Sequence, residues 1–378
     1  MSRTPGSAPR RKPTVTRRGV VAGLVGGVAA AGAAGAVAAG AQQHRAVNRL
    51  RERAQAAPAK YSELPADRAG TVTASDGVPL YVEEVGPVDA PLTVVFVHGY
   101  TLAMGSWWFQ RHDLSQRFGD RARLVFYDQR SHGRSGRSDS EHSSIDQLGR
   151  DLADVVTERA PRGPLVLVGH SMGGMTIMAL ADGQPELFAP GGQVRGVAFV
   201  ATSSGNLSKF TLGLPAVLAR LQTPLLGIGL RLARWQADNL ERGRRLGKDV
   251  AWTITQRLSF DDPDVDPATI AFVNDMISAT RVDVVADFLP TILRHDKGSA
   301  LEAMADLDVE IVCGDKDVML PLAHSKAIAE ALPHAHLTVV EGAGHMVALE
   351  KPEIVDDVIG GLVERALQTR SGAREVAS

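Results

Sequence analysis

The stretch that decides the fold is Val166-Leu167-Val168-Gly169-His170-Ser171-Met172-Gly173-Gly174. An apolar, β-forming run follows the breaker Pro164 and leads into Gly-x-Ser-x-Gly, after which residues 175–181 favour a helix. A serine at such a junction has a strained backbone, and glycines two positions before and after it remove Cβ atoms that would clash. The sequence therefore predicts that Ser171 projects above the edge of a sheet, where a substrate can reach it.

Gly-x-Ser-x-Gly can arise by chance in a glycine-rich chain, but the flanking strand and helix favour a functional motif. In this context, residues 169–174 resemble the nucleophile elbow of the α/β-hydrolase family. The resemblance implies an α/β fold with a mostly parallel, doubly wound sheet. It also implies that a helical cap is inserted over the active site.

Length and composition indicate a large globular protein that binds a small molecule. The 378 residues are 44% hydrophobic and can bury a large core. A net charge of −2 provides no field that would favour nucleic acid. The single cysteine, Cys313, follows apolar residues and is expected to be buried in a strand; one cysteine excludes an intramolecular disulfide and a cysteine-held zinc. We expect a small, largely neutral substrate.

The first 43 residues are predicted to be an export signal or a membrane anchor. Residues 1–18 hold six basic side chains, and residues 19–43 carry no charge. Ala39-Gly40-Ala41 is a candidate cleavage site, and Thr16-Arg17-Arg18-Gly19-Val20-Val21 partly resembles a twin-arginine signal. The alternatives are a retained transmembrane helix and a disordered Ala/Gly tail. We expect export to, or anchoring at, a bacterial cell envelope.

Residues 44–68 are predicted to be a spacer and linker, after which strands and helices alternate in a core formed by residues 69–203 and 300–370. The residue patterns predict strands at 71–73, 80–85, 92–97, 123–127, 194–200, 309–313 and 337–340, in addition to the strand before Ser171. Helices are expected at 106–118, 145–159 and 353–367.

Residues 204–299 interrupt this alternation with helical patterns and no convincing strand. Helices are expected at 212–221, 225–246, 251–258 and 269–278, the last behind Asp266-Pro267. The insertion resembles the family's cap. If apolar side chains of the insertion face the site, we expect the substrate to carry an apolar group. The apolar side chains in question are those of Leu212, Leu225, Leu226, Ile228 and Leu230. The four tryptophans either line this pocket or fill the core: Trp107, Trp108, Trp235 and Trp252.

Two strands after the cap each end in a side chain that could complete a serine-based site. The first ends in Gly314-Asp315-Lys316-Asp317, and the second in Glu341-Gly342-Ala343-Gly344-His345. A nucleophilic serine needs a base, and the base needs an acid to orient it. The order Ser, Asp, His is that of α/β-hydrolases. By resemblance, Asp317 is the acid and His345 the base, with Asp315 a rival acid that is more typical of a turn.

Backbone N–H groups are expected to stabilise the oxyanion of the tetrahedral intermediate, at roughly 3 kcal/mol per donor. One donor is Met172, which follows the nucleophile at a helix N-terminus. The other, by resemblance of His98-Gly99-Tyr100 to the family's His-Gly turn, is Tyr100. Only backbone is used, so both side chains should be free to vary. His98 is expected to form a hydrogen bond across the loop.

The remaining polar motifs are assigned structural roles. Asp128 and Arg130 are expected to pair within a loop that braces the elbow, and His132 belongs to the same loop. His170 is expected to be a packed or hydrogen-bonded neighbour. No metal and no dinucleotide cofactor are expected, because no Gly-x-Gly-x-x-Gly run follows the first central strand and the other histidines lack metal-ligand spacing: His295, His324, His334 and His336.

These features predict a serine hydrolase that cleaves a carboxylic ester with an apolar acyl or alcohol group through an acyl-enzyme. The family's epoxide hydrolases and dehalogenases use aspartate at the elbow, so Ser171 disfavours those reactions. Lactone, thioester or carbon–carbon bond hydrolysis and cofactor-free peroxidation stay open on this fold, as does a non-catalytic ligand-binding protein. Any membrane association is expected through the N-terminal segment, and the oligomeric state stays open.

Overall fold

The computed structural model describes residues 52, 61–207, 255–256, 258–262 and 264–375. The chain divides into two compact units, Met1–Glu52 and Arg53–Ser378, and every element described below belongs to the second. The predicted export or anchor segment lies outside the described residues. So do most of the predicted spacer, the predicted helices 212–221 and 225–246, and both Trp235 and Trp252.

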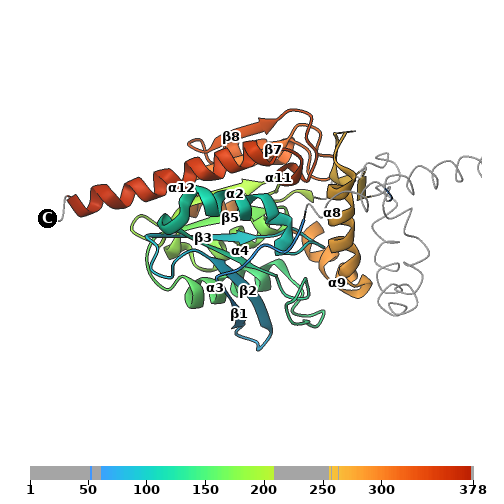
Figure 1. Cartoon of the computed structure of the whole chain (residues 1–378), viewed down its shortest axis with the longest axis horizontal. Helices are drawn as coiled ribbons and strands as arrows, with labels where there is room; N and C mark the ends of the chain where they lie inside the picture. The colour runs from blue at the N-terminus through green and yellow to red at the C-terminus, as the bar shows by residue number, and fades with distance from the viewer. Residues whose placement is uncertain (1–51, 53–60, 208–254, 257, 263, 376–378) are drawn as a thin grey trace, which may run out of the picture. The chain divides into compact units, whose positions relative to one another are not determined.

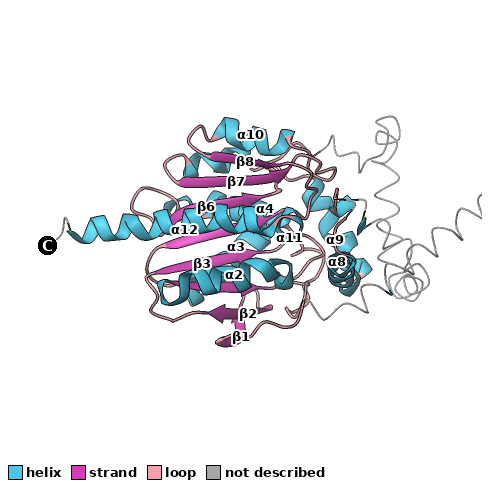
Figure 2. Ribbon diagram, turned by 45° about the horizontal axis from the view of Figure 1, so that its top comes forward, coloured by secondary structure: helices cyan, strands magenta, loops and turns pink. Residues whose placement is uncertain are grey.

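An eight-stranded sheet forms the core, with the strand order β1-β2-β4-β3-β5-β6-β7-β8. A hairpin of β1 and β2 forms one edge; β2 is also antiparallel to β4, and the remaining neighbours are parallel. The strands are β1 Arg68–Thr73, β2 Pro79–Val85, β3 Leu92–Val97, β4 Ala122–Tyr127, β5 Leu165–His170, β6 Val194–Val200, β7 Asp308–Gly314 and β8 His336–Val340. The predicted mostly parallel sheet is confirmed, and each predicted strand is present (Figure 2).

Helices cover both faces of the sheet, which explains the continuous apolar runs of its central strands. On one face Val95 and Val97 of β3 pack with residues of α3, α4 and α10. On the other, Val94 and Phe96 pack with residues of α2, α11 and α12. The helices are α2 Trp108–Phe118, α3 Ile145–Arg159, α4 Met172–Gly183, α10 Ala323–Ala331, α11 Val347–Glu350 and α12 Pro352–Glu375. Figure 1 shows the two helical layers on opposite sides of the sheet.

Short 3-10 helices complete several connections of the core. They are η1 Met104–Trp107, η2 Gly119–Arg121, η3 Pro185–Leu187 and η5 Gly298–Met304. Trp107 is 1% exposed and packs against Phe96 in the core, and Cys313 is buried in β7 as predicted. Helix α12 continues eight residues beyond the predicted end at residue 367, and α10 was not predicted.

Two helices of the predicted cap are described, α8 Pro267–Ala279 and α9 Val282–Leu293. Helix α8 confirms the predicted start, because the Asp266 side chain accepts a hydrogen bond from Ala268 N at 2.9 Å and Pro267 occupies the first turn. Helix α9 escaped prediction because Arg281 provides no side-chain cap and Pro290 lies inside the helix. Figure 1 shows both helices together beyond one end of the sheet.

No helix among the described residues combines the length and apolar character needed to cross a membrane.

The expected pairing of Asp128 with Arg130 is wrong. Asp128 accepts hydrogen bonds from Met104 N and Arg134 N, each at 2.8 Å, and so closes its own loop. Arg130 points elsewhere and forms two bonds to Asp151 of α3, at 2.5 and 2.6 Å. It also binds Asp76 of the β1–β2 turn at 2.7 Å. Successive loop residues point in different directions, and sequence spacing alone does not fix which partner each one meets.

Arg130 is therefore predicted to be a strong contributor to stability. Its side chain and that of Asp151 are both fully buried, so Arg130→Met leaves a buried carboxylate without its counter-ion and should lower the free energy of unfolding by about 3–5 kcal/mol. Urea denaturation followed by circular dichroism measures this. The control is Arg137→Met, which breaks an exposed pair with Asp283 and should cost less than about 1 kcal/mol. Equal losses in the two variants would contradict the assignment.

Candidate active site

Ser171 lies at the sharp turn between β5 and α4, as predicted. Its backbone has φ +52° and ψ −116°, a conformation that L-residues rarely adopt. The neighbouring glycines allow the turn: a Cβ on Gly173 would lie 2.1 Å from Val97 O, and one on Gly169 would lie 2.7 Å from Gly173. The Thr202 hydroxyl donates to Ser171 O at 2.6 Å and helps to hold this geometry.

The structure brings Ser171, His345 and Asp317 together. His345 Nε2 lies 3.0 Å from Ser171 Oγ, and His345 Nδ1 lies 2.7 Å from Asp317 Oδ2. The side chains come from the carboxyl-end loops of β5, β7 and β8, which is the ligand-binding edge of a parallel sheet. With Nδ1–H donating to Asp317, Nε2 is an acceptor facing the serine hydroxyl. This is the geometry that a serine nucleophile and its base require.

Asp315, the rival acid, does not contact His345. Its Oδ1 accepts a hydrogen bond from Gly342 N at 2.7 Å, and its Oδ2 pairs with Lys316 at 2.7 Å. Asp315 therefore fixes the turn between the β7 and β8 loops. Asp317, by contrast, is held by the N–H groups of Met319 and Leu320, both 2.8 Å from Oδ1. These bonds leave Oδ2 directed at His345.

Two further side chains position the loop that carries His345. His170 Nε2 lies 3.1 Å from the His345 carbonyl oxygen and donates to it, which confirms His170 as a hydrogen-bonded neighbour. Glu350 accepts from Gly344 N at 2.8 Å and from Asp261 N at 3.1 Å. It thereby joins the histidine loop to residues of the cap region. Sequence reasoning missed Glu350, because the residue belongs to no motif and acts through contacts that form only in the folded chain.

The predicted oxyanion donors lie beside Ser171. Met172 begins α4, and Tyr100 follows the His98-Gly99 turn after β3. Within the described part of the chain, neither N–H donates to a backbone carbonyl, so both are available to a developing oxyanion. Both residues line the same cavity as Ser171 and His345. Their role as donors stays a prediction.

The Tyr100 side chain is less free to vary than the sequence suggests. Its hydroxyl donates to Val285 O of α9 at 2.5 Å, and the Thr280 hydroxyl, between α8 and α9, donates to Thr101 O at 3.2 Å. Thr101 has a φ of +60°. The loop that carries the Tyr100 N–H is therefore tied to the cap by two hydrogen bonds.

His98 bonds across its loop, as predicted. Its Nδ1 donates to Gly99 O at 2.8 Å, and its Nε2 accepts from Gln129 N at 2.9 Å. The Gln129 amide returns a hydrogen bond to His98 O at 2.7 Å. Burial lowers the pKa of His98 to about 4, so the imidazole is neutral near pH 7 and can accept from Gln129. Burial, together with His345, likewise lowers the pKa of His170 to about 3.

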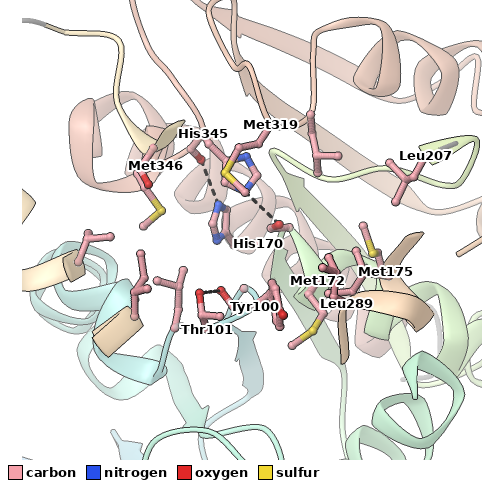
Figure 3. A pocket seen from close by; sticks show the side chains of 18 of the residues that line it. Tyr100, Thr101, His170, Met172, Met175, Leu207, Leu289, Met319, His345 and Met346 are labelled. Atoms are coloured by element: carbon pink, nitrogen blue, oxygen red, sulfur yellow. Dashed lines mark hydrogen bonds between the residues drawn. The ribbon is translucent and has the colours of Figure 1, made fainter. Parts of the chain in front are cut away.

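An apolar cavity opens above Ser171 and His345. Core residues supply four methionines, Met172, Met175, Met319 and Met346, which Figure 3 shows in the lining of the cavity together with His345. The cap helices contribute Val273 and Ile277 of α8 and Leu289, Ile292 and Leu293 of α9 to the same lining. Trp107 and Trp108 do not line this cavity. The flexible thioethers of methionine adapt to varied apolar shapes.

Among the described residues, one group of potential metal ligands lies near the amino ends of β7 and β8, whereas Asp317 and His345 follow the carboxyl ends of these strands. Ligand atoms of Asp308, Glu310 and His336 lie within 4.8 Å of one another. Arg365 donates to both carboxylates, at 2.5 Å each, so a cation already binds them. Asp308, Glu310, His336 and Arg365 therefore form an ion-paired cluster at the edge of the sheet.

Comparisons with known proteins give consistent results. The model of the alpha/beta hydrolase family matches residues 94–358. An uncharacterized protein of Mycobacterium tuberculosis is 26% identical over 296 residues, which cover 74% of this chain and 76% of that protein. The monoacylglycerol lipase of Mycolicibacterium smegmatis is 25% identical over 281 residues, covering 71% and 87%. A solved thermophilic esterase from Thermogutta terrifontis has a TM-score of 0.61 at 23% identity, covering 79% and 99%, which shows a shared fold.

Because His98 is buried and neutral in the folded protein, we expect the free energy of unfolding to depend on pH. The unfolded histidine titrates near 6.5 and the folded one at about 4, so between these values the unfolded state binds a proton that the folded state does not. Stability from this group is therefore lost as the pH falls, by about 1.4 kcal/mol per pH unit. His98→Gln, whose amide oxygen can replace Nε2 as acceptor, should show a slope shallower by about 1 kcal/mol per pH unit between pH 6.5 and 5 in urea denaturation. Identical slopes would contradict the neutral assignment.

Proposed function

The chain belongs to the alpha/beta hydrolase family, and we propose that it is a serine hydrolase that cleaves carboxylic esters through an acyl-enzyme. The observation that carries the proposal is the hydrogen-bonded series Asp317–His345–Ser171, with distances of 2.7 and 3.0 Å. The three residues are 4%, 5% and 9% exposed. They are thus shielded from bulk water, yet Ser171 and His345 border the cavity.

The proposed reaction begins with attack of Ser171 Oγ on the ester carbonyl carbon, while His345 Nε2 takes the hydroxyl proton. Asp317 keeps the ring oriented and stabilises its positive charge. The backbone N–H groups of Tyr100 and Met172 receive the oxyanion. Collapse of the tetrahedral intermediate breaks the bond to the alcohol, which leaves with the proton from His345. Water then attacks the acyl carbonyl carbon and gives a proton to His345. His345 passes this proton to Ser171 Oγ as the bond to the acyl group breaks, which releases the acid.

The proposed substrate is an ester with an apolar acyl or alcohol group. The cavity lining supports this, because side chains of methionine, leucine, isoleucine and valine dominate it. Burial of an apolar chain there contributes about 25 cal/mol per Å². The similarity to a protein named monoacylglycerol lipase also supports an ester substrate. The predicted contributions of Leu212 to Leu230 lie outside the described residues.

Substitutions in the two candidate acids should separate their roles. Asp317→Asn should lower kcat on p-nitrophenyl butyrate by about 10⁴-fold, because the histidine loses the partner that fixes its tautomer. Ser171→Ala should lower kcat at least as much. The matched control is Asp315→Asn, two residues away in the same loop, which should stay within about threefold of wild type because Asp315 does not contact His345. A larger loss from Asp315→Asn than from Asp317→Asn would reverse the assignment.

We further propose that residues 1–43 direct the protein to the cell envelope. The support is the basic segment followed by an uncharged Ala/Gly/Val segment. In a bacterial host, the full-length protein should fractionate with the envelope or the exported proteins, and Arg17→Lys with Arg18→Lys should retain it in the cytoplasm. Soluble, uncleaved full-length protein in the cytoplasm of the unsubstituted strain would contradict the proposal.

A further inference from the structure

Residues 61–66, which the sequence assigns to the linker, are packed against the fold. The Tyr61 ring stacks on Phe272 of α8, with ring centroids 4.2 Å apart and planes inclined by only 3°. The Tyr61 hydroxyl and the Thr269 hydroxyl are hydrogen-bonded at 2.7 Å. Burial raises the pKa of Tyr61 to about 12, so the hydroxyl keeps its proton at any pH near neutral. Tyr61 therefore contacts α8 through both its ring and its hydroxyl.

The same segment is fixed on its other side to the core. Tyr61 makes edge contacts with Trp108 and Phe109 of α2, at centroid distances of 5.5 and 5.8 Å. Trp108 Nε1 donates to Ser62 O at 2.9 Å. Arg111 donates to Leu64 O at 3.0 Å and to Pro65 O at 2.9 Å.

Arg111 itself is anchored to the sheet, since it pairs with Glu83 of β2 at 2.5 Å and both side chains are nearly buried. A charge-assisted bond of this kind is stronger than a neutral one. The path from β2 through Arg111 and the 61–66 segment to α8 therefore consists of direct contacts at every step. Residues 61–66 act as a clamp between the core and the cap.

Helix α8 contacts the clamp with one set of side chains and lines the cavity with a neighbouring set. Thr269 and Phe272 are three residues apart and contact Tyr61, while Val273 and Ile277 are four apart and line the cavity above Ser171. Residues three or four apart share one side of a helix. Because a helix moves as a rigid element, a shift at Phe272, which contacts Tyr61, also displaces Val273, which lines the cavity.

We propose that Tyr61 is a positioning residue of the substrate site, which holds α8 against α2 and so sets the shape of the apolar wall formed by Val273 and Ile277. Residues that precede the family-matched region 94–358 thus determine how long an apolar group the cavity accepts. The inference rests on the proposed function, because ester substrates report the shape of the wall.

The first test compares chain-length profiles of the full chain on p-nitrophenyl acetate, butyrate and octanoate. Tyr61→Ala removes both contacts to α8 and should raise KM for octanoate about tenfold, with KM for acetate within about twofold of wild type and kcat on acetate retained. Tyr61→Phe keeps the stacked ring and should restore most of the octanoate KM. The control Ile328→Val, a small loss of packing in α10 on the opposite side of the core, should leave the profile unchanged.

The second test does not depend on catalysis. Hydrogen exchange of the full chain should show amides of α8 exchanging at least about tenfold faster in Tyr61→Ala than in wild type, with α4 unchanged. Faster exchange with an unchanged chain-length profile would overturn the proposal, as would unchanged exchange. A third outcome separates the two proposals. If α8 exchanges faster in Tyr61→Ala but the wild-type protein cleaves none of the esters, the contact between Tyr61 and α8 is supported and the proposed function is refuted.

Discussion

The turn at Ser171 depends on three glycines, two of which let backbone approach backbone while the third makes room for the Thr202 side chain. An added Cβ would lie 2.1 Å from Val97 O at Gly173, 2.7 Å from the Gly173 carbonyl at Gly169, and 2.5 Å from the Thr202 hydroxyl at Gly174. The positive φ of Ser171 costs on the order of 1–3 kcal/mol, which the packed sheet around it must offset. The result is a serine hydroxyl that stands clear of the sheet with a helix N-terminus directly behind it.

Other residues with a strained backbone also lie at the carboxyl ends of the parallel strands. The non-glycine residues with positive φ in the described chain all follow parallel strands, in the loops after β3, β4, β5 and β6; they are Thr101, Ser131, Ser171, Ala201 and Asn206. These loops turn sharply as they leave the strands, so their side chains and N–H groups meet above the edge. The loops after β7 and β8 add Asp317 and His345. Helices α8 and α9 line the cavity at this edge, where Tyr100 donates a hydrogen bond to Val285 O and Tyr61 stacks on Phe272.

Local sequence pattern predicted the strands and the elbow serine Ser171, because buried strands and the elbow glycines leave signatures within a few residues. The resemblance to the α/β-hydrolase family added Asp317 and His345, and the structure brings them to Ser171. Contacts between distant elements left no such signature. Arg130 binds Asp151 and not Asp128 because loop side chains find partners only once strands are assembled. Tyr61 was assigned to a linker since nothing near it indicates that Phe272, more than two hundred residues later, stacks on its ring. Side-chain direction and long-range packing therefore had to come from the structure.

We propose above that Ser171 becomes a nucleophile through His345. It is tested most directly by incubating the full chain with a fluorophosphonate, digesting it, and locating the adduct by mass spectrometry. We predict a single phosphonylated peptide carrying the modification on Ser171, no labelling of Ser171→Ala, and labelling at least about 10³-fold slower in His345→Ala. Correctly folded protein that stays unlabelled, or an adduct on another serine, would contradict the account.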